Sequence, residues 1–403
     1  MTNSNVNLEA IRSLKSSAPD LTLLSEFKGW GSLKDSFAEG HKDYAELREL
    51  LTEDEYTIAK GSVLNAYYTS NEVITQIWDK LISAGFTGGR VLEPSCGTGK
   101  FISLCPQNVK EGVDFYGVEL DPIPSRICEL LNPQTKIYNQ DFSQINLPDN
   151  YFDLVIGNVP FGKYRVHDPR YNALCLSVHN YFIAKSLDLV KEGGVLCLIT
   201  SPSTLDSKNA KFREYLAKKS ELITAFRLPS EAFKTSNTEV SADVLILRKT
   251  SNGDELKNWI DTVEYNYSEA QFFPNLPAGN FFRADITCNQ YWLQELQGRA
   301  REQFSFNPKW HIAHKLLGLP TVNKLYGHGL SCSDNKGSYN FLEAIKAVPV
   351  PSNLFNLEVK KEEVILIPQS LQSAKLNSFV IFNNEVYIRD QDELLKSSVN
   401  VDK

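Results

Sequence analysis

Between residues 88 and 249 the sequence alternates short runs rich in β-branched and aromatic residues with amphipathic segments. Strands that alternate with helices are typical of a parallel β-sheet covered by helices, because the chain must cross back before the next parallel strand can begin. The alternation therefore predicts an α/β fold with a mostly parallel sheet. We expect seven strands, at residues 90–93, 115–120, 136–139, 152–157, 194–200, 223–228 and 243–249.

Helical segments are expected between these strands, at residues 99–105, 122–131, 179–190 and 210–219. Before the sheet, the segment EVITQIWDKLISA at residues 72–84 places Val73, Ile77 and Leu81 on one helical face, which predicts a helix that covers the sheet.

The segments on either side of this pattern differ from it and from each other. Residues 8–60 have a polar, helical pattern, and the pattern weakens after residue 250. We therefore expect an N-terminal helical segment at residues 1–60, a central domain at 61–252 and a small C-terminal accessory module at 253–403 that serves target recognition or partner binding.

Composition narrows the class of protein. Of the 403 residues 42% are hydrophobic and 23% are charged, as in ordinary globular proteins. No apolar run is long enough for a membrane span and the start is not a signal peptide, so a cytoplasmic location is expected. The seven cysteines form no CxxC pair and are expected to be reduced core residues. A net charge of -7 restricts nucleic-acid contact to a local patch.

The first expected strand leads into the turn RVLEPSCGTGKF at residues 90–101. Gly97 and Gly99 would let the backbone approach a ligand closely, since neither has a Cβ. A dinucleotide site would need a third glycine, which is absent. Glu93 precedes the turn, where a carboxylate suits a cationic amine, such as that of S-adenosylmethionine, and repels phosphate. The alternative is an ordinary tight turn between a strand and a helix.

Further acidic residues follow the next two strands. Glu119 comes about twenty residues after Gly99, where an acid can accept both hydroxyls of a ribose. Asp141 ends the third strand, where it could bind an adenine amine while Phe142 packs against the ring. Each acid taken alone could be a solvated carboxylate, but three at successive strand ends favour a nucleoside cofactor with a cationic amine.

The fourth strand ends in Asn158, Val159, Pro160 and Phe161. An exocyclic aryl amine is a poor nucleophile because its lone pair is delocalised into the ring. The Asn158 side-chain oxygen and the Val159 carbonyl could accept its two hydrogens and redirect the lone pair, while Phe161 offers a flat face to an extruded base. The alternative for this segment is a simple turn at the end of a strand.

With these residues the chain resembles the gamma-class N6-adenine DNA methyltransferases, whose N-P-P-[YF] motif corresponds to Asn158-Val159-Pro160-Phe161. Valine at the second position departs from the motif, but the family uses the carbonyl of that residue. The resemblance implies a Rossmann-like class I methyltransferase fold and S-adenosylmethionine as cofactor. It implies cofactor contacts from the residues in and around these motifs, namely Tyr68, Thr69, Glu93, Pro94, Cys96, Gly97, Gly99, Glu119, Leu120, Asp141 and Phe142.

Residues 8–250 also resemble the methylase portion of large methylase-helicase proteins of plasmids, phages and other mobile elements. Segments that carry this resemblance include FKGWGSLKDSF, LNAYYTSNEV, GVELDP and NVPFGKYRVHDPRYN. Ser70 stands where proline is common in that family. The resemblance implies DNA as a partner. No GxxxxGK[ST] loop is present, so a separate helicase or restriction subunit is a second implied partner.

A basic loop follows the Asn158 motif. Lys163, Arg165 and Arg170 alternate with Tyr164 and Tyr171, a mixture suited to phosphates and an unstacked base, although a solvated surface loop has the same composition.

Four aromatic and histidine positions outside this loop also bear on the site. Phe233 is expected against the flipped base or, alternatively, in the core. His311 and His314 lack acidic or cysteine partners nearby, so no metal is expected. Trp30 is expected to pack the N-terminal segment on the core.

Three hypotheses for the function follow. The first is a methyltransferase that acts on the N6 amine of a flipped adenine in DNA. A second keeps the chemistry but acts on protein glutamine or on RNA, because the N-P-P-[YF] motif recognises a planar NH2 group. The third is a noncatalytic module that binds the cofactor or DNA within a mobile-element system that has lost its helicase.

Overall fold

The computed structural model describes residues 3–63, 68–236, 241–251, 253–254, 257–268, 282–293, 295–296, 315–323, 329–334 and 340–355, and short segments between 365 and 396. All seven expected strands are present, with bounds that differ from the prediction by at most a few residues. They are β1 (Gly89–Glu93), β2 (Val113–Glu119), β3 (Lys136–Asn139), β4 (Phe152–Asn158), β5 (Val190–Thr200), β6 (Ser220–Leu228) and β7 (Ala242–Lys249).

The seven strands form one sheet in the order β3-β2-β1-β4-β5-β7-β6. The pairs from β3 to β5 are parallel, whereas β7 runs antiparallel to both β5 and β6. The strand order reverses beside β1, where open α/β sheets bind ligands at the carboxyl ends of their strands. The predicted Rossmann-like class I methyltransferase fold with a mostly parallel sheet is confirmed.

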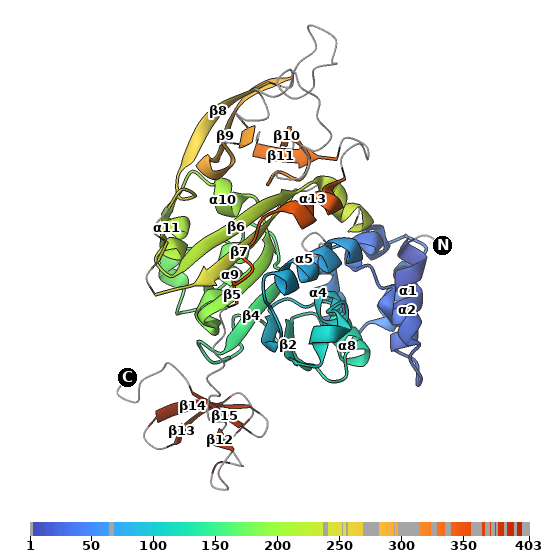
Figure 1. Cartoon of the computed structure of the whole chain (residues 1–403). Coiled ribbons are helices and arrows are strands. Elements are labelled where there is room, and N and C mark those ends of the chain that lie inside the picture. The colour runs from blue at the N-terminus through green and yellow to red at the C-terminus, as the bar shows by residue number, and fades with distance from the viewer. Residues whose placement is uncertain are drawn as a thin grey trace.

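Helices lie on both faces of this sheet (Figure 1). Helix α5 (Asn71–Ser83) begins at Ser70, whose hydroxyl accepts a hydrogen bond from the Val73 amide, and it buries Val73, Ile77 and Leu81 as predicted. The others that cross between strands are α6 (Lys100–Ser103), α7 (Gln107–Lys110), α8 (Pro122–Leu131), α9 (Val178–Leu189), α10 (Ser203–Asp206) and α11 (Lys211–Ala217).

The helix predicted at 99–105 is shorter than expected. It ends at Ser103, and Pro106 separates it from α7. A residue before proline is disfavoured in the helical region, which gives the break a local cause.

The N-terminal segment contains the expected helices. They are α1 (Asn3–Leu14), α2 (Leu21–Ser25), the 3-10 helix η1 (Trp30–Phe37), α3 (Tyr44–Leu50) and α4 (Glu53–Ser62). Helix α4 starts with a capping box between Thr52 and Glu55, which satisfies two amides at its end. Their apolar faces form one cluster with Ile123 and Ile127 of α8, so the segment packs directly on the sheet domain.

Part of the region after residue 252 also packs on the sheet domain. Residues 315–317 run beside β6, with the Arg227 amide 2.7 Å from the Lys315 carbonyl and the Leu317 amide 2.9 Å from the Arg227 carbonyl. The ammonium of Lys80 in α5 donates to the Lys346 and Val348 carbonyls at the end of α13 (Phe341–Ala347).

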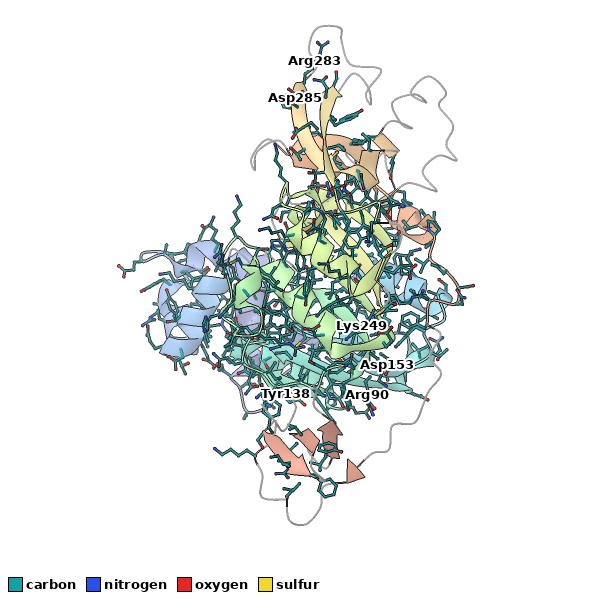
Figure 2. All side chains as sticks on the ribbon, turned by 90° about the vertical axis from the view of Figure 1, so that its left-hand side faces the viewer. Arg90, Tyr138, Asp153, Lys249, Arg283 and Asp285 are labelled. Atoms are coloured by element: carbon teal, nitrogen blue, oxygen red, sulfur yellow. The ribbon has the colours of Figure 1, made fainter. Side chains whose placement is uncertain are left out.

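Two antiparallel ribbons lie beyond β6. They are β8 (Thr262–Ser268) with β9 (Arg283–Asn289), and β10 (Leu319–Asn323) with β11 (Gly329–Ser333). In Figure 2 the labelled Arg283 and Asp285 lie on the β8–β9 ribbon at the top of the view, far from Arg90 and Asp153 in the central sheet.

A four-stranded sheet near the C-terminus lies apart from the other elements (Figure 1). Its strands are β12 (Ile365–Leu366), β13 (Phe379–Phe382), β14 (Glu385–Asp390) and β15 (Glu393–Lys396). The domain boundaries near 60 and 252 stay predictions.

The cysteines are free, and six of the seven are buried as expected. Cys175 is exposed, because it lies in the surface loop after β4 rather than in an apolar run.

Candidate functional site

A cavity of about 530 Å³ opens at the carboxyl ends of β1, β2, β3 and β4. Each of these strands, or the turn that follows it, contributes a polar side chain to the lining, so the four predicted strand-end positions meet in one place. They are Glu93, Glu119, Asp141 and Asn158. A cavity of this size is in the range that binds cofactors and small molecules.

The turn after β1 forms one wall of the cavity. Gly97 lines it with a φ of +53°, a conformation that glycine adopts without strain, and the Gly97 amide donates to the Glu119 carboxylate at 2.8 Å. Glu119 also accepts from the Asp121 amide at 2.9 Å. These contacts hold the glycine turn against the end of β2, and Pro94 and Cys96 line the same wall.

Gly99 lies elsewhere than expected. It is not among the residues that line the cavity, and a Cβ at this position would clash with the Cys128 sulfur and lie 2.8 Å from the Asn132 side-chain nitrogen. Close packing of the turn on α8 therefore accounts for this glycine, rather than the close approach to a ligand that the sequence suggested.

Glu93 is a buried carboxylate that faces the cavity. Its side chain is 3% exposed, and Oε2 has no hydrogen-bond partner among the described residues. Burial, with smaller contributions from Cys128 and Glu119, raises the pKa of Glu93 well above its ordinary value. An acceptor that is buried without a partner is costly, so the cavity is suited to a ligand that brings a donor, and a cationic donor above all.

The end of β3 contributes a second polar and apolar pair. Asp141 accepts a hydrogen bond from the Ser143 amide at 2.8 Å and lines the cavity. Phe142 stacks on Phe182 of α9 with 4.8 Å between ring centroids. Leu120, at the end of β2, lines the same cavity although its side chain is 55% exposed. This part of the cavity has flat apolar walls beside one acid, which suits a nucleobase with an exocyclic amine.

Asn158 lies at the end of β4 with its backbone and side chain both held. The Ser95 hydroxyl donates to the Asn158 carbonyl at 2.8 Å, and Asn158 Nδ2 donates to the Thr69 hydroxyl at 3.2 Å. The amide is thus oriented with its acceptor oxygen turned away from Thr69. The Val159 amide donates to the Ile199 carbonyl at 3.1 Å, and both Val159 and Pro160 line the cavity.

The N-terminal segment closes another side of the cavity. The Trp30 indole donates to the Asp121 carboxylate at 2.6 Å, and both residues line the cavity. Trp30 is thus buried on the core, as predicted. Tyr68 also lines the cavity, whereas Tyr67 lies outside the described residues. Helix α4 contributes four further lining residues, which are Thr57, Ile58, Gly61 and Ser62.

The two phenylalanines expected to stack on a substrate base are not on the cavity. Phe161 is 9% exposed and Phe233 is 2% exposed, and both belong to the hydrophobic cluster beneath the sheet. The core placement that was the alternative for Phe233 is the observed one. Burial of both rings leaves neither with a free face in this conformation.

The basic side chains of the loop after β4 differ in their contacts. Lys163 and Arg165 are exposed, and Arg165 lines a second, smaller cavity of about 290 Å³. Arg170 instead forms ion pairs with Asp149 and Asp188, at 2.8 and 2.9 Å. Its guanidinium thus has a structural role in joining this loop to α9.

Several residues of the cavity were not predicted as site residues. Asp121 and Val166 lie within segments that carry the family resemblance but were given no role there. Val178, Phe182 and the lining residues of α4 come from segments without a recognisable motif, and those of α4 lie more than thirty residues before the glycine turn. Tyr164 lines the cavity although it was assigned to DNA contact. The sequence indicated only through Trp30 that the N-terminal segment packs on this domain.

Within the described ranges, every helix is too short or too polar to span a lipid bilayer. The same residues contain no cluster of three or more histidine, cysteine or acidic side chains that could hold a metal ion. His311 and His314 lie outside the described residues.

Comparison with known proteins gives relatives that match parts of the chain. This chain is 32% identical over 249 residues to the defense against restriction protein B of Escherichia phage P1. The aligned region covers 59% of this chain and 11% of the phage protein. This chain is also 29% identical over 197 residues to the type II methyltransferase M.CvrRI of Paramecium bursaria Chlorella virus XZ-6E, covering 46% and 49% of the two chains. The chain thus spans less than half the length of these curated relatives.

Among solved structures, the methyltransferase subunit of a type I restriction-modification system from Streptococcus thermophilus matches with a TM-score of 0.41 and 15% identity, over 75% of each chain. The model of the family described as N-6 DNA Methylase matches residues 47–272, more than half of the chain and the whole of the cavity-forming sheet. The chain therefore belongs to the N-6 DNA methylase family.

Proposed function

We propose that this protein transfers a methyl group from S-adenosylmethionine to the exocyclic N6 amine of an adenine extruded from DNA. The observation that carries the proposal is the meeting of Glu93, Glu119, Asp141 and Asn158 on one cavity at the carboxyl ends of four adjacent strands. Membership of the N-6 DNA methylase family supports the same reaction.

The residues of the cavity fit S-adenosylmethionine. The buried Glu93 oxygen suits the ammonium of the methionine part, and the Glu119 carboxylate suits the ribose hydroxyls. Asp141 would accept the adenine amine, with Leu120 and Phe142 against the ring. Pro94, Cys96 and Gly97 line the wall from the turn, and Tyr68 and Thr69 line the wall from the segment before α5.

When bound, the cofactor supplies a methyl group on a sulfonium, which is electrophilic without further activation. Asn158 and the Val159 carbonyl would accept the two hydrogens of the target amine and turn its lone pair toward that methyl. The contact of Asn158 with Thr69 fixes the amide before substrate arrives, so the gain is one of orientation and preorganised electrostatics. Pro160 lines the same part of the cavity and limits where the base can lie.

DNA is the proposed macromolecular partner, with Lys163 and Arg165 as phosphate contacts. A separate helicase or restriction subunit is a second proposed partner. The support for it is that residues 8–250 resemble the methylase portion of methylase-helicase proteins, while the sequence contains no GxxxxGK[ST] loop.

Incubation of the protein with radiolabelled S-adenosylmethionine and, separately, unmethylated DNA, RNA and release-factor protein tests the proposal. Label is expected on DNA and on neither of the others. Label on RNA or on protein glutamine would show that the protein transfers methyl groups to a substrate other than DNA. Cofactor binding without label on any of the three would show a noncatalytic module.

A further inference from the structure

Two large apolar side chains on the cavity are exposed. Among the described residues six large apolar side chains are exposed, and two of them, Leu120 at 55% and Tyr164 at 49%, line the same cavity. Single exposed apolar residues are common on protein surfaces, but a pair on one concave site is typical of a place where a ligand completes the packing.

Tyr164 lies near the acid at the end of β3. It lines the cavity with Asp141 and Phe182, and the charge of Asp141 adds to burial in raising the pKa of the Tyr164 phenol. Leu120 reaches the cavity from the end of β2. Leu120 and Tyr164 thus line the same cavity as Asp141, the acid that suits an adenine amine.

The loop that carries Tyr164 is held in place by buried contacts. The Tyr164 carbonyl accepts from the Val178 amide at 3.0 Å, which ties the loop to the first turn of α9. Further along, the Asp168 carboxylate accepts from the Tyr181 hydroxyl at 2.7 Å and lies 3.6 Å from the Lys185 ammonium. An aromatic ring on a fixed loop loses little freedom when a ligand packs against it.

The other aromatic rings of the cavity are less available. Trp30, Phe101, Phe142 and Phe182 are buried, and the last two stack on each other, while Tyr68 is partly buried. Phe161 and Phe233 belong to the core. Tyr164 is therefore the aromatic side chain of this cavity, among the described residues, with the largest exposed fraction.

We propose that the Tyr164 ring packs against the cofactor's nucleobase, in addition to Leu120 and Phe142, with Asp141 at the exocyclic amine of that base. The inference rests on the proposed function, since it assigns a second wall to the nucleoside part of the same cofactor site. The loop after the Asn158 motif then contributes to cofactor binding, in addition to its proposed contact with DNA.

Calorimetric titration with two ligands tests this assignment. S-adenosylhomocysteine carries the amino-acid part of the cofactor, whereas 5′-methylthioadenosine lacks it, and both contain adenine. Tyr164→Ala is expected to weaken the binding of both ligands by a similar factor, on the order of tenfold, because the lost contact is to the adenine base that both ligands contain. Tyr164→Phe keeps the ring and should bind both within about twofold of wild type.

Leu174→Ala is the matched control, because Leu174 is an exposed apolar residue of the same loop that lines neither cavity. It should leave both affinities unchanged. Thermal melting of each variant checks that it is folded.

Unchanged affinity for both ligands in folded Tyr164→Ala would overturn the assignment. If the same variant lost affinity only for DNA that carries an extruded adenine, Tyr164 would contact the target base instead. Failure of the wild-type protein to bind either ligand is a different result, since it would overturn the proposed cofactor site itself and the Tyr164 assignment with it.

Discussion

At the scale of single residues, Glu93 shows how a buried atom constrains a ligand. A carboxylate oxygen that is buried without a partner is unfavourable in the free protein, and a cationic donor would relieve that cost. The cavity therefore selects for positive charge at this position, beside walls that suit a nucleoside.

Glu93→Gln is expected to weaken the binding of S-adenosylhomocysteine by roughly tenfold or more, because the ammonium of the ligand loses its counter-charge. The affinity for 5′-methylthioadenosine should stay within about twofold, since this ligand has no ammonium to lose. Isothermal titration of both ligands checks the prediction. Equal weakening of the two ligands would show that Glu93 acts on the shape of the pocket rather than on charge.

Gly99 is explained by packing, and this too can be tested. Gly99→Ala adds a Cβ that clashes with Cys128 at a φ of +75°, so unfolding free energy should fall by about 2–4 kcal/mol. Gly193 has a φ of +76°, and a Cβ added there would meet no atom within 4 Å, so Gly193→Ala should cost only about 1–2 kcal/mol for the backbone. Denaturant titration compares the two. Equal losses would mean that the contact with α8 does not require glycine.

At the scale of elements, a hydrogen bond at the cavity joins the N-terminal helices to Asp121, which lies between β2 and α8. The Trp30 indole of η1 and the Ile123 amide of α8 both donate to Asp121. Burial, with the nearby charge of Glu119, nonetheless raises the pKa of Asp121 to about 7. Because the pKa is raised in the folded state, the stabilisation from this group is complete below about pH 4 and is lost as pH rises toward 7.

Asp121→Asn should therefore reduce the fall in unfolding free energy between pH 5 and 8. Overall stability should drop by about 1 kcal/mol, since one of the two donors loses its acceptor. Asp35→Asn, at an exposed position, should keep the wild-type slope. Denaturant unfolding at four pH values gives the comparison. A slope in Asp121→Asn equal to that of the wild type would contradict the role assigned to this carboxyl.

The sequence predicted the sheet well because each central strand is a buried run. In β4 all residues from Phe152 to Gly157 are buried, and such a run ending in Asn158 is recognisable without a structure. Since parallel strands align their carboxyl ends, the strand-end acids could also be predicted to share an edge. The glycine turn was recognised because it directly follows the buried run of β1.

What the sequence could not reveal is which way a side chain faces outside regular elements. Phe161 and Tyr164 are three residues apart in one loop, yet the first is in the core and the second is on the cavity. No periodicity distinguishes such positions. The Trp30–Asp121 contact joins residues 91 apart, and its geometry depends on how two separate helices pack.

At the scale of the whole molecule, the chain after residue 252 divides into two parts. Residues 315–317 extend beside β6 and α13 is tied to α5 through Lys80, so these segments belong to the folded body. The sheet of β12 to β15 lies apart from that body in Figure 1. We therefore expect the C-terminal region to consist of two parts, one of which belongs to the folded body.

Two truncations test this division. A chain ending at residue 355 should keep the melting temperature of the full-length protein within about 2 °C, because the described elements that it removes all belong to the separate sheet. A chain ending at residue 252 should melt at least about 5 °C lower, because it uncovers apolar surface on α5 and β6. Scanning calorimetry gives both values. Equal stability of the two truncated chains would instead favour an independent domain beginning at 253.

The central claim is the transfer of a methyl group to adenine N6 in DNA, and nucleoside analysis tests it most directly. DNA incubated with the protein and S-adenosylmethionine is digested, and N6-methyldeoxyadenosine is quantified by mass spectrometry. The wild type and the distant control Asn108→Ala should form it, and Asn158→Ala should form at least about a hundredfold less. Undiminished product in Asn158→Ala, or a methyl group on any atom other than adenine N6, would contradict the account.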